Sequence, residues 1–232
     1  NISSLRSDLK KLANSEKSKV LQRFFKTGKG EYGEGDVFLG ITVPESRKIA
    51  IKYHSISLED IKFLLESKIH EERLIALLIL VHRYNINLKE RKSIFDFYLD
   101  NTKYINNWDL VDLSADKIVG RFLYDFGKDY PLYQILLKKL AESSNIWERR
   151  IAIISTFHYI KTNKFDETIN LRKSTSADPL SIEFLGDALK ITSFDEAGNK
   201  FTAYVGEEYY LGAGESVDVD IDGETKTITL TD

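Results

Sequence analysis

A repeat constrains the fold of this chain more than any other feature. Residues 70–76 read His-Glu-Glu-Arg-Leu-Ile-Ala, and residues 147–153, 77 positions later, read Trp-Glu-Arg-Arg-Ile-Ala-Ile. A related Asn-Trp-Asp at 107–109 lies midway, because Trp108 precedes Trp147 by 39 positions. A period of about 40 residues is typical of solenoids built from helix pairs. Since one pair cannot bury its apolar face alone, we expect the pairs to stack and to present a concave surface that suits an extended ligand.

The spacing of apolar residues supports this helical interpretation. Short helices are expected after Ser3, around residues 20–25, from Pro44, and from Ser57, which caps its helix together with Asp60. Longer helices are predicted over residues 69–84, 88–99, 108–126, 131–141 and 146–161. We therefore predict a mainly α fold, a HEAT-like α-solenoid of stacked antiparallel helix pairs over residues 1–174.

Residues 28–35 interrupt the helices with four glycines in eight positions. This composition predicts a loop. Glycines of this kind can cradle a phosphate, but no Gly-Lys-Ser/Thr sequence follows, so a nucleotide site of the Walker type is not expected.

The last quarter of the chain differs in charge and pattern. Residues 1–174 carry 30 Lys and Arg against 23 Asp and Glu, whereas residues 175–232 carry 3 Lys against 13 Asp and Glu. A basic body suits a polyanionic partner, and an acidic segment repels one. Alternating strand patterns, with predicted turns at 196–199 and 222–223, indicate a small β-meander or half-sandwich. We expect a second domain over residues 175–232, joined by a linker at 174–179 and able to bind a protein partner.

Several function classes are excluded or disfavoured. The chain has no cysteine, which excludes disulfides, thiolate metal sites and cysteine nucleophiles. Its four histidines lack metal-ligand spacing, and the Asp218, Asp220 and Asp222 pattern suits a strand better than a calcium loop. We expect no metal and no cofactor. No long apolar run or secretion signal is evident, so no membrane partner and a cytoplasmic location are expected.

Four segments carry a resemblance to a known family. They are Phe-Phe-Lys-Thr-Gly at 24–28 with Gly-Glu-Gly-Asp-Val-Phe-Leu-Gly-Ile at 33–41, His-Glu-Glu-Arg at 70–73, Trp-Asp-Leu-Val-Asp at 108–112, and Asn-Ile-Trp-Glu-Arg-Arg at 145–150. In this order and spacing they resemble the DNA alkylation repair family, the HEAT-repeat alkylpurine DNA glycosylases, over about residues 1–173. The family continues with a further repeat after the segment around Arg150, and we expect residues 1–174 to lack it.

The resemblance implies DNA repair by hydrolytic removal of N3- or N7-alkylated purines from double-stranded DNA. Trp108 and Asp112 would share one helix face, since they lie four residues apart. A positively charged alkylpurine gains cation–π attraction beside an indole, on the order of 0.5–2 kcal/mol. A fixed carboxylate at Asp112 stabilises the oxocarbenium-like sugar formed as the base leaves, and can orient the attacking water. The expected catalytic residues are therefore Asp112 and Trp108.

The resemblance also assigns DNA contacts. Arg150 would hold a backbone phosphate by bidentate hydrogen bonds, and Phe24 stands where the family places an aromatic residue near the DNA. Each residue has a structural alternative: a tryptophan in the core, an aspartate near a helix start, an arginine in a surface ion pair. Trp147 is expected in the core. The alternative function is a non-catalytic HEAT scaffold that binds DNA or a protein.

Overall fold

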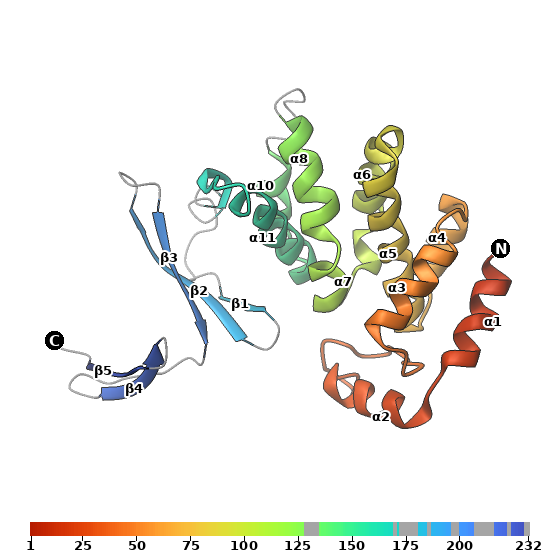
Figure 1. The fold of residues 1–232 in the computed structure, drawn as a ribbon, viewed down its shortest axis with the longest axis horizontal. Coiled ribbons are helices and arrows are strands. Elements are labelled where there is room, and N and C mark those ends of the chain that lie inside the picture. Colours follow the sequence, from red (N-terminus) through yellow and green to blue (C-terminus); the bar gives the residue numbers. More distant parts are fainter. Residues whose placement is uncertain are drawn as a thin grey trace. The chain divides into compact units, whose positions relative to one another are not determined.

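The computed structural model describes residues 1–127, 135–168, 171, 181–184, 187–195, 200–206, 216–221 and 224–229, with side chains up to residue 171. The chain divides into two compact units, Asn1–Ser176 and Ala177–Asp232. In Figure 1 the described helices of the first unit progress from α1 on the right, through α5 and α6, to α8, α10 and α11 on the left, with α2 below them. This arrangement confirms the mainly helical body and is consistent with the predicted α-solenoid, whose HEAT type stays a prediction.

The helices of the first unit are short, apart from α5 and α11. The described α-helices are α1 (Ile2–Leu12), α2 (Ser15–Phe24), α3 (Val43–Lys52), α4 (Leu58–Leu65), α5 (His70–Ile86), α6 (Arg91–Asp100), α7 (Trp108–Asp112), α8 (Arg121–Phe126), α10 (Leu136–Ala141) and α11 (Ile146–Ile160). Between them lie the 3-10 turns η1 (Leu88–Glu90) and η2 (Thr102–Tyr104) and the π-helical segment η3 (Asp116–Gly120). Among the described residues no helix combines the length and the apolar character that a membrane span needs.

Side chains fix where several helices begin. The Asn14 side chain accepts a hydrogen bond from the Lys17 amide at 3.0 Å, and the predicted cap at Ser57 accepts from the Asp60 amide at 3.0 Å. Asn107 and Asn145 cap α7 and α11 in the same way. Because the first amides of a helix have no partner within it, these caps set the helix starts.

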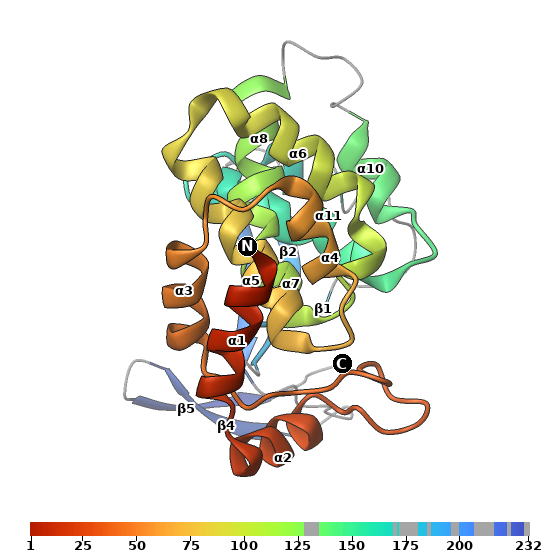
Figure 2. The same ribbon diagram turned by 90° about the vertical axis from the view of Figure 1, so that its right-hand side faces the viewer.

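Helix α5 forms the centre of the core. Its residues from His70 to Val81 are all buried, and it packs against α3, α4 and α6. Helix α11 takes a similar place in the last part of the unit, against α10, η3 and α7. Figure 2 shows the other extreme: α2 lies below α1 and α3, and no residue within it is buried.

The single helix predicted over residues 108–126 is wrong, because three segments replace it: α7, η3 and α8. The Ser114 hydroxyl donates to the Leu110 carbonyl, a contact that bends helices. A Cβ on Gly120 would lie 2.2 Å from the Ser155 carbonyl oxygen, so the π-helical segment ends at a close approach of the backbone to α11. The start of the predicted helix over 131–141 lies outside the described residues, which resume before α10.

The loop before α3 is tied to the start of α5. Val37 and Ile69 form a parallel bridge, and the His70 amide donates to the Val37 carbonyl at 2.9 Å. The buried Glu71 carboxylate accepts from the backbone amides of Leu39, Gly40 and Ile41, at distances between 2.8 and 3.2 Å. A buried carboxylate needs such donors, so these bonds fix the loop path.

The second unit is described by its strands alone. Strands β1 (Ser181–Phe184), β2 (Asp187–Asp195) and β3 (Lys200–Gly206) form an antiparallel sheet in chain order, and β4 (Ser216–Ile221) pairs with β5 (Glu224–Thr229). The predicted linker at 174–179 and the predicted turns at 196–199 and 222–223 lie outside the described residues. A separate β domain with these bounds stays a prediction.

Gly40 lies where the loop before α3 closely approaches the start of α2. Its φ is +81°, and an added Cβ would lie 2.2 Å from the Asn14 carbonyl oxygen and 2.7 Å from the Ser18 amide nitrogen. We expect Gly40→Ala to lower the free energy of unfolding by about 2–4 kcal/mol, because a left-handed backbone strain adds to a backbone clash. Urea unfolding measures the change.

Gly30→Ala is the matched control. Gly30 has a φ of +80°, but no heavy atom lies within 4 Å of its added Cβ, so only the strain of about 1–2 kcal/mol applies. Equal losses in the two variants would show that the contact of the loop with α2 is unimportant.

Candidate functional site

A cluster of aromatic rings surrounds Trp108 at the start of α7. The indole stacks on Phe25, with ring centroids 5.2 Å apart and planes at 15°, and meets the edge of Phe24 at 6.1 Å. Its Nε1 donates to the Tyr32 hydroxyl at 3.2 Å, and the Tyr32 ring meets Trp147 edge-on at 6.1 Å. The glycine-rich loop that carries Tyr32 thus connects α7 to α11.

An ion pair joins the same two helices. Arg150 of α11 donates from Nε and Nη2 to the two carboxylate oxygens of Asp112, at 2.8 and 2.7 Å. The side chains are 15% and 11% exposed, so this is a largely desolvated, bidentate contact. Asp112 lies one turn after Trp108 on α7, and Arg150 lies three residues after Trp147 on α11. The ring cluster and the ion pair therefore occupy one side of the α7–α11 contact.

Two opposing effects set the pKa of Asp112. Burial raises it, because desolvation disfavours the carboxylate, while the hydrogen bonds and positive charge of Arg150 lower it. Burial dominates, so the pKa of Asp112 lies above the ordinary value for an aspartate. Arg150 thus fixes the position of the carboxylate, while the pKa of Asp112 stays above its ordinary value.

A second set of buried charges lies behind the rings. His70 bonds through Nδ1 to Asp36 at 3.0 Å and through Nε2 to Asp109 at 2.8 Å, and Arg73 donates to Asp36 as well. Burial alone lowers the pKa of His70, but the two carboxylates outweigh it and raise the pKa to about 9. The imidazole is therefore an imidazolium near neutral pH, and both of its N–H groups donate.

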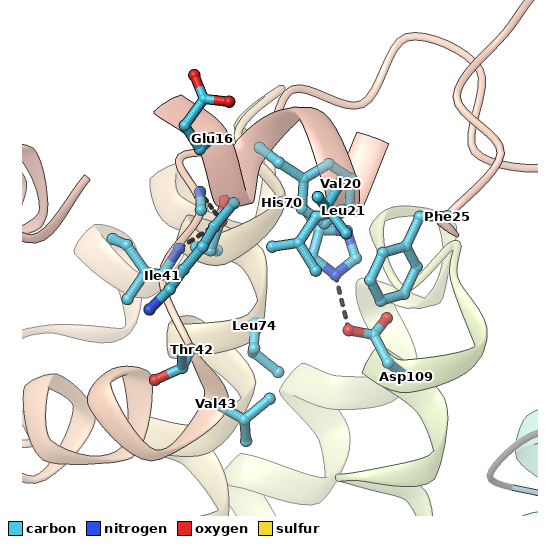
Figure 3. Close-up of a pocket in the computed structure, with 14 residues that line it drawn as sticks. Glu16, Val20, Leu21, Phe25, Ile41, Thr42, Val43, His70, Leu74 and Asp109 are labelled. Atoms are coloured by element: carbon cyan, nitrogen blue, oxygen red, sulfur yellow. Dashed lines mark hydrogen bonds and ion pairs between the residues drawn. The ribbon is translucent and has the colours of Figure 1, made fainter. Parts of the chain in front are cut away.

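A pocket of about 530 Å³ adjoins these groups (Figure 3). Its walls come mainly from apolar side chains of α2, the loop before α3 and α5, with His70 and Asp109 on one side. Three polar side chains at this wall have hydrogen-bond partners. His70 bonds to Asp109, Asp109 also accepts from the Leu110 amide, and Glu71 accepts from the loop amides. Within the described part of the chain, no group of three or more His, Cys, Asp and Glu side chains could hold a metal ion.

The structure brings the sequence-predicted residues together. Trp108 is partly buried, Asp112 and Arg150 are paired, and Phe24, 62% exposed, lies at the edge of the ring cluster. Their assigned roles stay predictions. The expectation that Trp147 is a core residue is wrong, because its ring is partly exposed and meets Tyr32.

Sequence reasoning missed Tyr32 and the buried set of Asp36, His70 and Asp109. Tyr32 lies in the loop at 28–35, whose glycines predict a loop but give no sign of a contact with Trp108. Asp109 follows Trp108 directly, and His70 is the first residue of the repeated segment at 70–76. Their places within these segments are the signal in the sequence that could have identified them. Their mutual contact depends on packing between repeats, which spacing along the chain does not reveal.

The comparison with protein families now identifies the class. Residues 5–182 match the family model described as DNA alkylation repair enzyme. The match covers more than three quarters of the chain and extends past Ser174, where the sequence predicted the end of the body. The chain therefore belongs to the DNA alkylation repair enzyme family. A comparison with curated proteins gives no match.

The pKa of His70 predicts how stability depends on pH. A pKa raised from 6.5 to about 9 contributes stability that is fully present below pH 6.5 and is lost as the pH rises through 9. We expect the wild-type protein to lose up to about 3 kcal/mol of unfolding free energy over this range relative to His70→Gln. Urea unfolding at several pH values measures both proteins.

His54→Gln serves as the control, because His54 bonds to the nearby Ile51 carbonyl and meets the His82 ring edge-on, with neither Asp36 nor Asp109 among its described partners. Its stability should follow the wild-type curve. A constant difference between wild type and His70→Gln at all pH values would show that the imidazolium is not the stabilising form.

Proposed function

We propose that this protein is a DNA glycosylase that hydrolyses the bond between deoxyribose and an N3- or N7-alkylated purine in duplex DNA. The observation that carries the proposal is the Asp112 carboxylate, held by Arg150 in a bidentate pair one helical turn from the partly exposed ring of Trp108. Membership in a DNA alkylation repair family supports it.

The chemistry requires stabilisation of positive charge. The C1′–N bond breaks with its electron pair moving to the purine, which neutralises the alkylated ring and leaves positive charge on the sugar. A nearby carboxylate stabilises that charge more strongly than the charge of the starting lesion, which lies further away on the base. Water then adds to C1′ and loses a proton. Asp112 is the catalytic carboxylate in this scheme.

Trp108 would recognise the lesion. The stack on Phe25 and the hydrogen bond to Tyr32 fix the orientation of the indole. Its π system attracts a cationic alkylpurine and has weaker affinity for a neutral base, by about 0.5–2 kcal/mol. This preference needs no deep pocket for the base.

Arg150 and Phe24 are proposed to contact DNA. Arg150 orients Asp112 through two of its N–H groups, and it places a positive charge next to the carboxylate. A phosphate beside it would be positioned relative to the catalytic carboxylate. Phe24 is exposed next to Trp108, where it can pack against the backbone or a base.

Release of 7-methylguanine from methylated duplex DNA tests the proposal. We expect wild-type protein to release the base and Asp112→Asn to reduce the rate by at least about a hundredfold, because the neutral amide does not stabilise a cationic sugar. Binding to the same duplex should change little, as measured by fluorescence anisotropy.

Asp116→Asn is the matched control. Asp116 is also a buried carboxylate with a cationic partner, Lys161 at 2.7 Å, but it makes no contact with the ring cluster in the described contacts. Its variant should retain the rate of base release. Retained release in Asp112→Asn would remove Asp112 from the mechanism.

The rate should fall at acidic pH. Only ionised Asp112 stabilises the sugar, so kcat is expected to decline as the pH falls through the raised pKa of Asp112. Removing the charge in Arg150→Gln takes away the effect that lowers this pKa, and the acid limb should move to higher pH. Initial rates at saturating DNA, corrected for uncatalysed release, measure the acid limb of the pH–rate profile for the wild type and for Arg150→Gln. An unmoved limb would mean that Asp112 does not control it.

The same assays separate the alternative function. A non-catalytic helical scaffold would bind DNA in a salt-sensitive way and release no base. A protein-binding scaffold would show no DNA affinity at low salt, and the acidic segment at 175–232 is then the proposed contact for a protein partner.

A further inference from the structure

Trp108 stands at one end of a stack of four rings that come from three segments: α7, the segment between α2 and α3, and α5. Phe25 lies next to Trp108 and stacks on Phe38, with centroids 4.9 Å apart and planes at 19°. Phe38 in turn stacks on the imidazole of His70, at 4.4 Å and 21°. The ring of His70 also meets Phe25 at 5.0 Å. The indole of Trp108 is thus connected to α5 by the stacked rings of Phe25 and Phe38.

His70 reaches the same helix turn by a second route. Its Nε2 bonds to Asp109, the residue after Trp108, at 2.8 Å. The other Asp109 oxygen accepts from the Leu110 amide at 2.8 Å. The imidazole of His70 therefore contacts the phenyl rings on which Trp108 stacks, and it also bonds to the first turn of α7, the helix that contains Trp108.

The stack borders a pocket that His70 also lines. The pocket of about 530 Å³ lies beside Phe25 and Phe38, beneath Val20 and Leu21 of α2 (Figure 3). No residue within α2 is buried. Close packing normally fixes a side chain, and the pocket leaves part of the surface of Phe25 and Phe38 without packed neighbours. The hydrogen bonds of His70 supply the missing constraint.

The two carboxylates fix His70 itself. Asp36 bonds to Nδ1 at 3.0 Å and is held by Arg73, while Asp109 bonds to Nε2. His70 is 2% exposed. A buried imidazole that bonds to a carboxylate on each side has a single favourable orientation, since both ring nitrogens must point at their partners.

We propose that His70, clamped between Asp36 and Asp109, is a positioning residue that holds the indole of Trp108 in the orientation needed against a cationic alkylpurine. This rests on the proposed glycosylase function. His70 does not touch the DNA. It acts through Phe38, Phe25 and Asp109.

Kinetics of 7-methylguanine release test the inference. We expect His70→Gln to lower kcat by about ten- to hundredfold, since a displacement of about 1 Å at a catalytic group has effects of this size. KM should stay within about twofold of the wild-type value, because the contacts to the DNA backbone remain. Unchanged kcat in a folded His70→Gln protein would overturn the inference.

Glu72→Gln is the matched control for stability. Glu72 is also buried in the first turn of α5, and it forms a bidentate pair with Arg6, away from the ring stack. Its variant loses a half-exposed ion pair at a buried carboxylate but should keep the wild-type kcat. An equal fall in kcat for both variants would mean that His70 acts through stability alone. If His70→Gln does not fold, Asp36→Asn keeps an acceptor for Nδ1 and should show the same effect at smaller size.

The emission of Trp108 gives a test that needs no activity. The chain has two tryptophans, so Trp147→Phe leaves Trp108 as the only tryptophan, and selective excitation of tryptophan reports on it alone. In that background we expect His70→Gln to shift the emission to longer wavelength and to lower its anisotropy, whereas Glu72→Gln leaves both unchanged. Unchanged emission in His70→Gln would overturn the inference. Absence of Asp112-dependent release in wild type, with the expected emission shift, would instead refute the proposed function and leave the positioning of Trp108 supported.

Discussion

The structure depends on four consecutive ionisable side chains buried in the first turn of α5. Residues 70–73 are between 2% and 4% exposed. Such burial is strongly unfavourable for unpaired charges. Each side chain therefore reaches a polar or charged partner, and His70 and Arg73 share Asp36. His70 reaches Asp36 and Asp109, Glu71 reaches the loop amides at 39–41, Glu72 reaches Arg6 of α1, and Arg73 reaches Asp36 and the Ser67 carbonyl. This single turn ties α1, the loop before α3 and α7 to the core helix.

The candidate site is assembled on that foundation by contacts between repeats. Trp108 rests on rings supplied by the segment between α2 and α3, and Asp112 is oriented by α11. No single segment contains the site. A shift of any one helix would separate an aromatic ring or a charge from its partner, because packed interiors tolerate little displacement. This explains why buried, strongly bonded charges stand behind a surface that is proposed to meet DNA.

The mainly helical body followed from the pattern of apolar residues and a period of about 40 positions. The cap at Ser57 could also be predicted from the sequence, since a serine at a helix start commonly accepts a hydrogen bond from the amide three residues later, here that of Asp60. The prediction of one helix over 108–126 was wrong, because the spacing of apolar residues does not show where another helix approaches the backbone. Gly120 lies against the Ser155 carbonyl, and the segment before it is a π-helix. Trp147 was misplaced for a related reason, as an aromatic at helical spacing is compatible with either a core or a partly exposed position.

The sequence by itself determined which residues could carry chemistry: a tryptophan and an aspartate four positions apart, and an arginine in the next repeat. Local spacing is enough for that, because i and i+4 share a helix face. Only the tertiary structure decided that Arg150 pairs with Asp112, that Tyr32 reaches both tryptophans, and that His70 lies between two carboxylates. These contacts join residues 34 to 115 positions apart, and they arise from the stacking of helices, which brings residues together by the geometry of packing and not by distance along the chain.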